Sequence, residues 1–110
     1  MPRMEGKKRN IAILGSTGSI GTQALEVVSL HPDRFEVYAL VANNQVELLI
    51  EQARTYHPEV VVIANESKYE QLKLALNDLP IKVWRGSEAI EEVVQDEEID
   101  MVLTAMVGFS

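Results

Sequence analysis

Residues 11–21 read IAILGSTGSIG and decide how this chain folds. The apolar run at 11–14 is typical of a short buried strand. Glycines follow at 15, 18 and 21, and a helical pattern of apolar residues begins at Ser19. Glycine lets the backbone turn sharply and approach a ligand closely. The first N–H groups of a helix are unpaired and carry a partial positive charge. Together these features predict a turn that holds a nucleotide phosphate.

The alternation of strand and helix continues along the chain. Strands are expected at 11–14, 36–41, 60–64, 81–84 and 101–105. Helices are expected between them, at 19–30, from Asn44 to His57, from Ser67 onward, and after Gly86. This alternation predicts right-handed crossovers and a parallel sheet with helices on both faces. We therefore predict an α/β fold, a Rossmann-like doubly wound parallel sheet in three αβα layers, with strand order 3-2-1 and a later strand beside strand 1.

Apolar spacing predicts which face of each helix packs on the sheet. For the first helix, these residues are Ile20, Ala24, Val27 and Val28. For the fourth helix, they are Ile90, Val93 and Val94. At the start of the second helix, Asn44 is followed three residues later by Glu47, which predicts a capping box.

Length and charge limit what the chain can be. Its 110 residues suit one compact domain. A net charge of −7 argues against nucleic acid as a partner, because phosphate binding there needs a basic surface. The absence of cysteine excludes a disulfide scaffold, a thiolate zinc site and a cysteine nucleophile within these residues. No apolar run reaches membrane-spanning length and no apolar signal core is present, so we expect a cytoplasmic protein without a membrane partner.

The glycine spacing is GxxGxxG, which differs from the GxGxxG of the commonest dinucleotide-binding turn. We expect Gly15 to form the tight turn and Gly18 to come closest to phosphate. Gly21 should let the helix lie against the sheet. The hydroxyls of Thr17 and Ser19 are the better candidates for phosphate contact, with Ser16 a third. The alternatives are that one hydroxyl only caps the helix, or that the turn holds no ligand.

The end of the second predicted strand indicates which dinucleotide fits. An acidic residue there would accept a hydrogen bond from the ribose 2′-hydroxyl of NAD and repel a 2′-phosphate. This chain instead has Asn43, Asn44 and Gln45. The missing carboxylate favours NADP over strict NAD use. No Arg or Lys lies among these residues to pair with the phosphate.

Three segments resemble, in order, parts of the 1-deoxy-D-xylulose 5-phosphate reductoisomerase family. They are residues 13–23 (ILGSTGSIGTQ), 39–44 (ALVANN) and 105–108 (AMVG). The resemblance implies an NADPH-dependent oxidoreductase of the non-mevalonate isoprenoid pathway. Such an enzyme isomerises and reduces 1-deoxy-D-xylulose 5-phosphate to 2-C-methyl-D-erythritol 4-phosphate. It also implies a divalent metal, Mg or Mn, and a homodimer in the intact enzyme.

The resemblance also assigns residue roles. It implies that Thr17, Gly18, Ser19 and Ile20 contact the pyrophosphate, within a turn bounded by Gly15 and Gly21. It places Asn43, Asn44 and Gln45 at the adenosine ribose and its 2′-phosphate. Ala105 and Met106 would lie near the nicotinamide. The family's metal ligands, substrate-phosphate residues and active-site loop correspond to positions beyond Ser110.

Residues 1–9 lack an apolar signal core, and we expect them to form a disordered leader. Residues 10–110 would form an NADP(H)-binding Rossmann-like domain that is truncated on its carboxyl-terminal side. No catalytic or metal-binding residue is then expected in the chain, and the fragment alone should be inactive. Two alternatives remain. One is the dinucleotide-binding domain of another GxxGxxG oxidoreductase, such as a semialdehyde dehydrogenase, which would need a downstream cysteine. The other is a non-catalytic nucleotide-sensing module.

Overall fold

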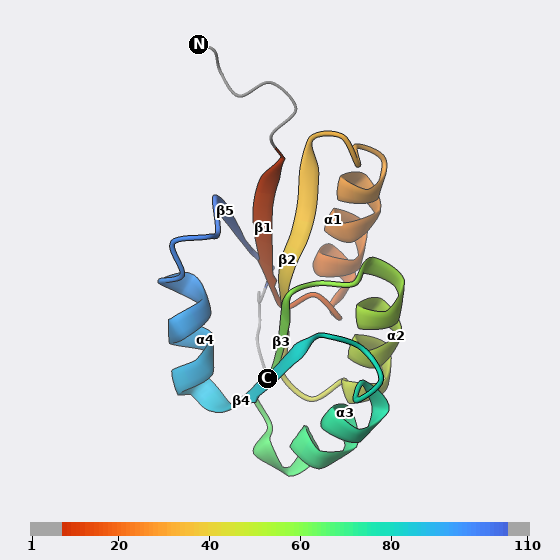
Figure 1. Ribbon diagram of the computed structural model, residues 1–110, viewed down its shortest axis with the longest axis vertical. Coiled ribbons are helices and arrows are strands. Elements are labelled where there is room, and N and C mark those ends of the chain that lie inside the picture. The colour runs from red at the N-terminus through yellow and green to blue at the C-terminus, as the bar shows by residue number, and fades with distance from the viewer. Residues whose placement is uncertain (1–7, 106–110) are drawn as a thin grey trace.

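Five parallel strands form one sheet in the computed structural model, which describes residues 8–105 (Figure 1). Their order across the sheet is β4-β3-β2-β1-β5. This order confirms the predicted 3-2-1 arrangement with a later strand beside strand 1, and it shows that this later strand is β5. The strands are β1 (Arg9–Leu14), β2 (Phe35–Ala42), β3 (Val60–Ile63), β4 (Lys82–Arg85) and β5 (Met101–Thr104). The first strand therefore begins at Arg9, two residues before the expected start.

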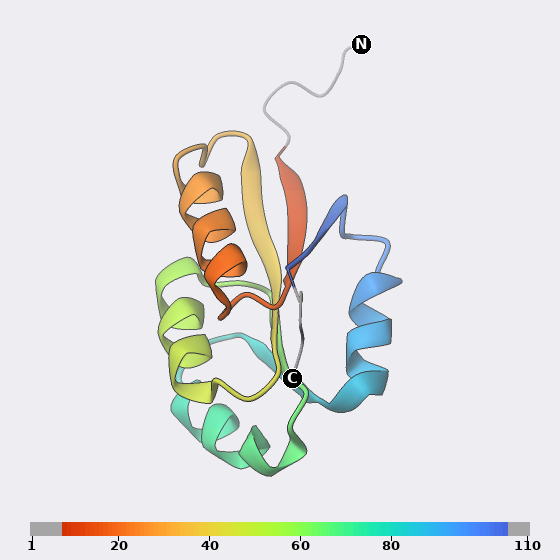
Figure 2. The same ribbon diagram turned by 180° about the vertical axis from the view of Figure 1, so that it is seen from behind.

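Helices cover both faces of the sheet. They are α1 (Ser19–Ser29), α2 (Val46–Tyr56), α3 (Tyr69–Ala75) and α4 (Gly86–Val94), with a 3₁₀ turn η1 (Glu66–Lys68) before α3. The two opposite views place α1, α2 and α3 on one face and α4 on the other (Figures 1 and 2). The predicted three-layer α/β architecture is therefore confirmed.

Successive residues of the central strands contribute to two separate cores. In β1, Ile11 and Ile13 pack in the core that contains residues of α1, α2 and α3. Ala12 and Leu14 pack in the core that contains Ala89 and Val93 of α4. All four β1 residues are less than 9% exposed. Burial on both faces explains why these strands are continuous apolar runs.

One extra residue interrupts the pairing of β2 with β1. Ile11 pairs with Val37, but the next residue, Ala12, pairs with Ala39, so Tyr38 is bulged. Val37 belongs to the core on the α1–α3 face. Tyr38 and Ala39 both lie against the core on the α4 face. The in-and-out alternation of side chains therefore restarts at Ala39 and continues in phase to the carboxyl end of the strand.

The predicted inner face of α1 is only partly right. Val28 is buried as expected, but Ile20 and Val27 are 52% and 57% exposed. The buried stripe runs instead through Gly21, Leu25 and Val28. The helix packs closely at Gly21, where the missing side chain lets it approach the preceding turn. The apolar spacing therefore placed the inner face of α1 at the wrong rotation about the helix axis, because it gave no weight to Gly21.

The same error affects α4. Val94, predicted to face inward, is 47% exposed, whereas Ala89 is 9% exposed and packs in the core. Val93 is buried as predicted. A small residue again marks the line of closest approach, because a short side chain lets the helix lie near the sheet.

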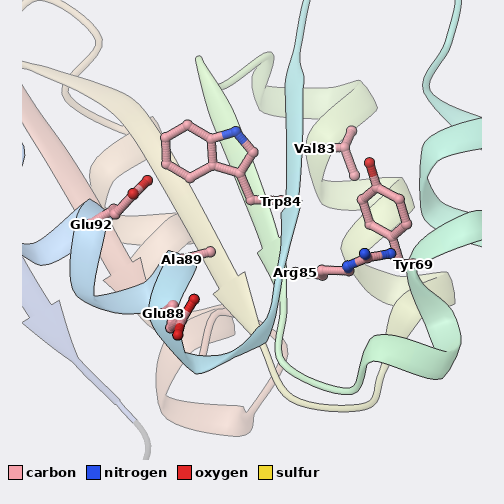
Figure 3. A pocket seen from close by; sticks show the side chains of 7 residues that line it. All are labelled: Tyr69, Val83, Trp84, Arg85, Glu88, Ala89 and Glu92. Carbon is pink, nitrogen blue, oxygen red and sulfur yellow. The ribbon is translucent and has the colours of Figure 1, made fainter.

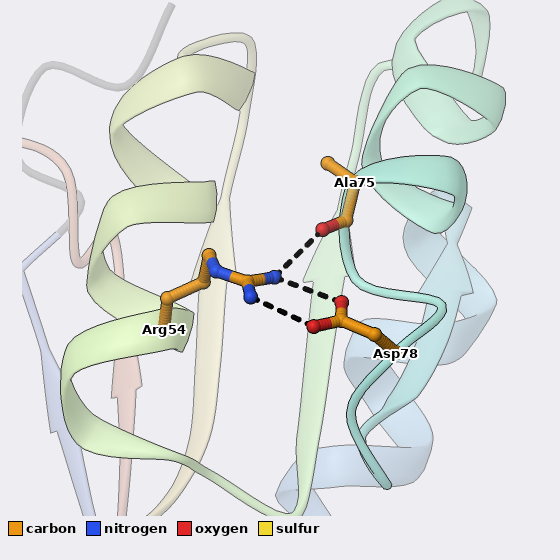
Figure 4. A network of polar contacts seen from close by, with 3 residues as sticks. All are labelled: Arg54, Ala75 and Asp78. Atoms are coloured by element: carbon orange, nitrogen blue, oxygen red, sulfur yellow. Dashed lines mark hydrogen bonds and ion pairs between the residues drawn. The ribbon is translucent and has the colours of Figure 1, made fainter.

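A polar clamp joins α2 to the segment after α3 (Figure 4). The Arg54 guanidinium donates to both carboxylate oxygens of Asp78, at 3.0 and 2.8 Å, and to the backbone oxygen of Ala75 at 3.0 Å. Hydrogen bonding from Arg54 is the main reason that the pKa of Asp78 is lowered to about 2. A depressed carboxyl pKa stabilises the folded state above the unfolded-state pKa, and this contribution disappears as the pH falls through the folded-state value.

We expect Asp78→Asn to lower the free energy of unfolding near neutral pH, because it replaces the carboxylate that Arg54 binds. The effect should be small, since both side chains are exposed to solvent. The difference in the free energy of unfolding between Asp78→Asn and wild type should shrink as the pH falls from about 4 to about 2. Urea unfolding at a series of pH values measures it. Asp33→Asn, at an exposed turn, is the control. A difference that persists unchanged at about pH 2 would contradict the pKa assignment.

Candidate nucleotide-binding site

The candidate site lies where parallel strands end at one edge of the sheet. Backbone N–H groups of Gly15 and Ser16, directly after β1, donate to the carbonyl of Val41 in β2 at 2.7 and 3.0 Å. The N–H of Ala105, directly after β5, donates to the carbonyl of Leu14 at 2.7 Å. The structure thus brings the glycine turn, the end of β2 and Ala105 together. Ligands of open α/β sheets bind at this kind of edge.

The turn after β1 is tight, and two of its glycines are needed for its shape. Gly15 has φ +89°, a left-handed conformation that favours glycine. The N–H of Gly18 donates to the carbonyl of Gly15 at 3.2 Å and closes the turn. A Cβ atom on Gly21 would lie 2.1 Å from the carbonyl oxygen of Gly15 and 2.7 Å from the Cα of Ser16. Gly21 therefore allows the contact between turn and helix.

Gly18 has a different role in the same turn. It is the N-cap of α1 in extended conformation, with φ −77° and ψ 173°. A Cβ atom there would meet nothing closer than 3.7 Å. Gly18, Ser19 and Ile20 are all exposed. The mouth of the turn is therefore open at the positions expected to meet phosphate.

The start of α1 offers hydrogen-bond donors to a ligand. Within residues 8–105, no backbone carbonyl accepts from the N–H of Ser19, Ile20 or Gly21. The first turn of α1 contains no acidic residue that would offset the positive end of the helix dipole. The arrangement suits an anion such as a diphosphate.

The three hydroxyl residues of the turn differ in their exposure. Ser19 is exposed and Thr17 is half-buried, so both can reach a bound anion. Ser16 is 0% exposed, and its hydroxyl has no hydrogen-bond partner among the described residues. Gly18, not a hydroxyl residue, is the N-cap of α1, and it makes no side-chain capping bond. The interpretation of a hydroxyl as a simple N-cap is therefore wrong, and phosphate contact by Thr17 and Ser19 stays a prediction.

At the end of β2, the structure replaces the predicted capping box with a different contact. Gln45, not Asn44, is the N-cap of α2, and it makes no side-chain capping bond. The Asn44 side-chain oxygen instead accepts from the Asn65 amide at 2.7 Å. Asn65 is the second residue after the end of β3, and its N–H also donates to the carbonyl of Asn43 at 3.0 Å. The loops after β2 and β3 are thus bonded to each other.

Sequence reasoning missed Asn65. Its side-chain oxygen accepts from both the N–H and the hydroxyl of Ser67, at 3.0 and 2.7 Å, and caps the 3₁₀ turn before α3. An Asn two residues before a Ser at the end of a strand is typical of such a local cap. That signal could have identified the cap, but not the contact with Asn44.

A second residue was missed on the inner face of α2. The Gln52 side chain is 6% exposed, and its amide donates to the carbonyl of Ser16 at 2.9 Å. Helical spacing places Gln52 beside the buried residues Leu49 and Ala53. A polar residue at an apolar position is a signal for a buried hydrogen bond. Its partner, 36 residues earlier, could not be named from the sequence.

The nicotinamide end of the predicted site is only partly described. Ala105 is half-buried, and its carbonyl oxygen would lie 4.0 Å from a Cβ atom on Gly18. It therefore borders the glycine turn. Met106, also predicted to lie near the nicotinamide, falls outside the described residues.

A separate hollow of about 400 Å³ follows the edge strand β4 (Figure 3). Tyr69 and Val83 lie on one side of the strand, and Trp84 and Ala89 lie on the other. The Arg85 guanidinium carbon stacks 4.8 Å from the centre of the Tyr69 ring. Two strands separate β4 from β1. This hollow is therefore not continuous with the glycine turn.

Within residues 8–105, no group of three or more His, Asp or Glu side chains is placed to hold a metal ion. The described part of the chain also contains no helix that is both long and apolar enough to cross a membrane.

The sheet order and the open glycine turn at its carboxyl edge define a Rossmann-type α/β domain. A family model described as 1-deoxy-D-xylulose 5-phosphate reductoisomerase matches residues 11–110. The chain therefore belongs to the 1-deoxy-D-xylulose 5-phosphate reductoisomerase family.

Relatives and solved structures of this family resemble the chain closely. The reductoisomerase of Bacteroides thetaiotaomicron is 66% identical over 106 residues, which cover 96% of this chain and 27% of the relative. The reductoisomerase of Porphyromonas gingivalis is 65% identical over 103 residues, which cover 94% of this chain and 27% of the relative. A crystal structure of DOX-P reductoisomerase in complex with magnesium superposes with a TM-score of 0.82 at 33% identity, covering 87% of this chain and 24% of that one.

The reductoisomerase from Zymomonas mobilis in complex with NADPH superposes with a TM-score of 0.75 at 36% identity, covering 78% of this chain and 23% of that one. The chain thus spans about a quarter of the length of the relatives that it matches.

Proposed function

We propose that this chain is the NADPH-binding segment of a 1-deoxy-D-xylulose 5-phosphate reductoisomerase. The observation that carries the proposal is the open turn at Gly18, where exposed backbone N–H groups begin a helix with no acidic residue in its first turn. Because the chain has a net charge of −7, its contacts with phosphate would come from backbone N–H groups and hydroxyls. The similarity to a reductoisomerase in complex with NADPH supports this ligand.

In this proposal, the pyrophosphate lies over residues 15–21. The N–H groups of Ser19 and Ile20, for which no backbone carbonyl accepts within residues 8–105, orient it beside Gly18, with hydroxyl donors from Thr17 and Ser19. Asn43, Asn44 and Gln45 receive the adenosine ribose. None of these three carries a negative charge, so a 2′-phosphate is not repelled there. Ala105 and Met106 adjoin the nicotinamide end.

The intact enzyme would isomerise 1-deoxy-D-xylulose 5-phosphate and reduce it to 2-C-methyl-D-erythritol 4-phosphate, in the cytoplasm and as a homodimer. NADPH, when bound, supplies the hydride. Residues 15–21 hold the dinucleotide in place for that transfer. The reaction's divalent metal, Mg or Mn, finds no fitting ligand set within residues 8–105. We therefore assign no metal ligand in this chain and expect the chain alone to be inactive. The family match disfavours both a semialdehyde dehydrogenase and a sensing module.

Titration of the chain with NADPH, NADP⁺, NADH and AMP tests the proposed function. We expect both 2′-phosphorylated dinucleotides to bind and NADH to bind no more tightly than NADPH, because no carboxylate follows β2 to accept the ribose 2′-hydroxyl. AMP, which lacks the diphosphate, should bind weakly. Isothermal calorimetry provides the affinities. A clear preference for NADH, or equal affinity for AMP and NADPH, would overturn the proposal.

A further inference from the structure

Gln52 is a buried amide that contacts the glycine turn from another helix. It lies on α2 between Leu49 and Ala53, both 0% exposed, and is itself 6% exposed. Burying an amide is costly unless it is hydrogen-bonded. Among the described residues, its nitrogen donates to the carbonyl of Ser16 at 2.9 Å, whereas its oxygen has no partner. The bond to Ser16 is thus the specific contact that this side chain makes in the core.

The contact completes the support of the turn. Val41 of β2 accepts from the N–H groups of Gly15 and Ser16. Gly21 of α1 packs directly against Gly15 and Ser16. Gln52 of α2 adds the third attachment, at the carbonyl of Ser16. The other two attachments leave this carbonyl without a backbone donor within residues 8–105.

Because the peptide between Ser16 and Thr17 is planar, the bond from Gln52 to the Ser16 carbonyl also sets the direction of the Thr17 N–H. A trans peptide is planar, so its carbonyl and the following N–H point in opposite directions. The Ser16 carbonyl points toward Gln52 in the core. The N–H of Thr17, in the same peptide, therefore points away from α2. Thr17 is only half-buried and precedes the exposed Gly18.

We propose that Gln52 is a positioning residue for the dinucleotide phosphate. By holding the Ser16 carbonyl, it directs the Thr17 N–H toward the mouth of the turn. This inference rests on the proposed function for the identity of the ligand. The orientation of the Thr17 peptide, however, can be measured without any ligand.

Gln52→Glu tests the proposal because it changes only the atom that faces Ser16. A protonated carboxyl can still donate to the Ser16 carbonyl, whereas an ionised one cannot. Burial raises the pKa of such a carboxyl above its usual range. We expect NADP⁺ to bind the variant within about 2-fold of wild type near pH 5, and about 10-fold or more weakly near pH 8. Gln52→Met has no hydrogen-bond donor at any pH, so it should bind NADP⁺ weakly at both pH values.

Gln71→Glu is the matched control, since it makes the same change at an exposed position of α3. Each affinity is divided by that of wild type at the same pH, which removes the titration of the ligand's own phosphate. In parallel, amide hydrogen exchange and the ¹⁵N–¹H chemical shift of Thr17 are recorded on the ligand-free chain. In Gln52→Glu we expect both signals to match wild type near pH 5 and to differ from wild type near pH 8, whereas in Gln71→Glu they should match wild type at both pH values.

The two readouts separate the possible failures. If the wild-type chain binds no dinucleotide, the proposed function fails, but Thr17 signals that depart from wild type near pH 8 and not near pH 5 in Gln52→Glu still support the positioning role. If a folded Gln52→Met keeps the wild-type Thr17 signals and the wild-type affinity, the positioning role is overturned. Equal loss of affinity at both pH values in a folded Gln52→Glu would also overturn it, because the carboxylic acid would then fail to replace the amide donor.

Discussion

Gly21→Ala is expected to lower the free energy of unfolding by about 3 kcal/mol or more. The new Cβ atom would lie 2.1 Å from the Gly15 oxygen, 2.7 Å from the Ser16 Cα and 2.9 Å from the Gly15 carbonyl carbon. All three are backbone atoms, so no side-chain rotation relieves the clash. Alanine's helix propensity exceeds that of glycine by only about 1 kcal/mol, which is too little to compensate. Chemical denaturation followed by circular dichroism measures the loss.

The control for this change is Gln23→Ala, which introduces the same side chain at an exposed position of α1. It should leave the free energy of unfolding within about 0.5 kcal/mol of wild type. A Gly21→Ala chain as stable as the Gln23→Ala chain would show that α1 does not pack against the turn at this point.

Gly18→Val is expected to leave the chain folded and to weaken NADPH binding by at least about 100-fold. The backbone of Gly18 is extended, and a Cβ atom there has no neighbour closer than 3.7 Å. Replacing glycine by valine at an N-cap costs about 1 kcal/mol. The branched side chain would occupy the open mouth of the turn and keep phosphate from the backbone N–H groups. Losing two charge-assisted hydrogen bonds of about 1.5 kcal/mol each reduces affinity about 100-fold.

Gln23→Val places the same side chain on the exposed part of α1 and should bind NADPH like wild type. Calorimetric titration gives the affinities, and thermal unfolding shows that both variants are folded. Normal NADPH binding by a folded Gly18→Val chain would contradict the assignment of residues 15–21 to the phosphate. Two glycines only three positions apart are thus expected to differ in role, because Gly21 is needed for stability and Gly18 for ligand binding.

The sheet could be predicted because its signals are local. Each central strand is a continuous apolar run, and glycine or proline marks most of the turns between strands and helices. The general rules for parallel crossovers then allow few strand orders. They were sufficient to place β3 beside β2 and a later strand beside β1, and the structure identifies that later strand as β5. The turn at residues 15–21 could also be predicted, because the strand, the glycines and the start of the helix are contiguous in the sequence.

The rotation of the helices was harder to predict, because close packing depends on small residues. Gly21 and Ala89 carry little weight in an apolar pattern, yet they lie where α1 and α4 approach their neighbours. The larger Ile20, Val27 and Val94 are exposed instead. Hydrophobic periodicity therefore located the helices but misplaced part of their inner faces.

The supporting contacts of the site could not be predicted because they join distant parts of the chain. Asn65 reaches Asn44 across 21 residues, and Gln52 reaches Ser16 across 36 residues. Asn44 had a plausible local role as a helix cap, which a single sequence cannot distinguish from a contact across loops. A buried glutamine signals that a partner exists, but only the fold identifies that partner.

The bulge at Tyr38 divides β2 into two parts with different tolerance to changes in length. Beyond it, Ala39 to Val41 pair residue by residue with both β1 and β3, and Ala42 pairs with β3. An insertion or deletion there would shift the strand end that leads to Asn43 and reverse which side chains face each core. Before it, β2 pairs with β1 alone. Length variation among homologous proteins should therefore be absorbed near residues 35–38, while the segment leading to the ligand keeps a fixed number of residues.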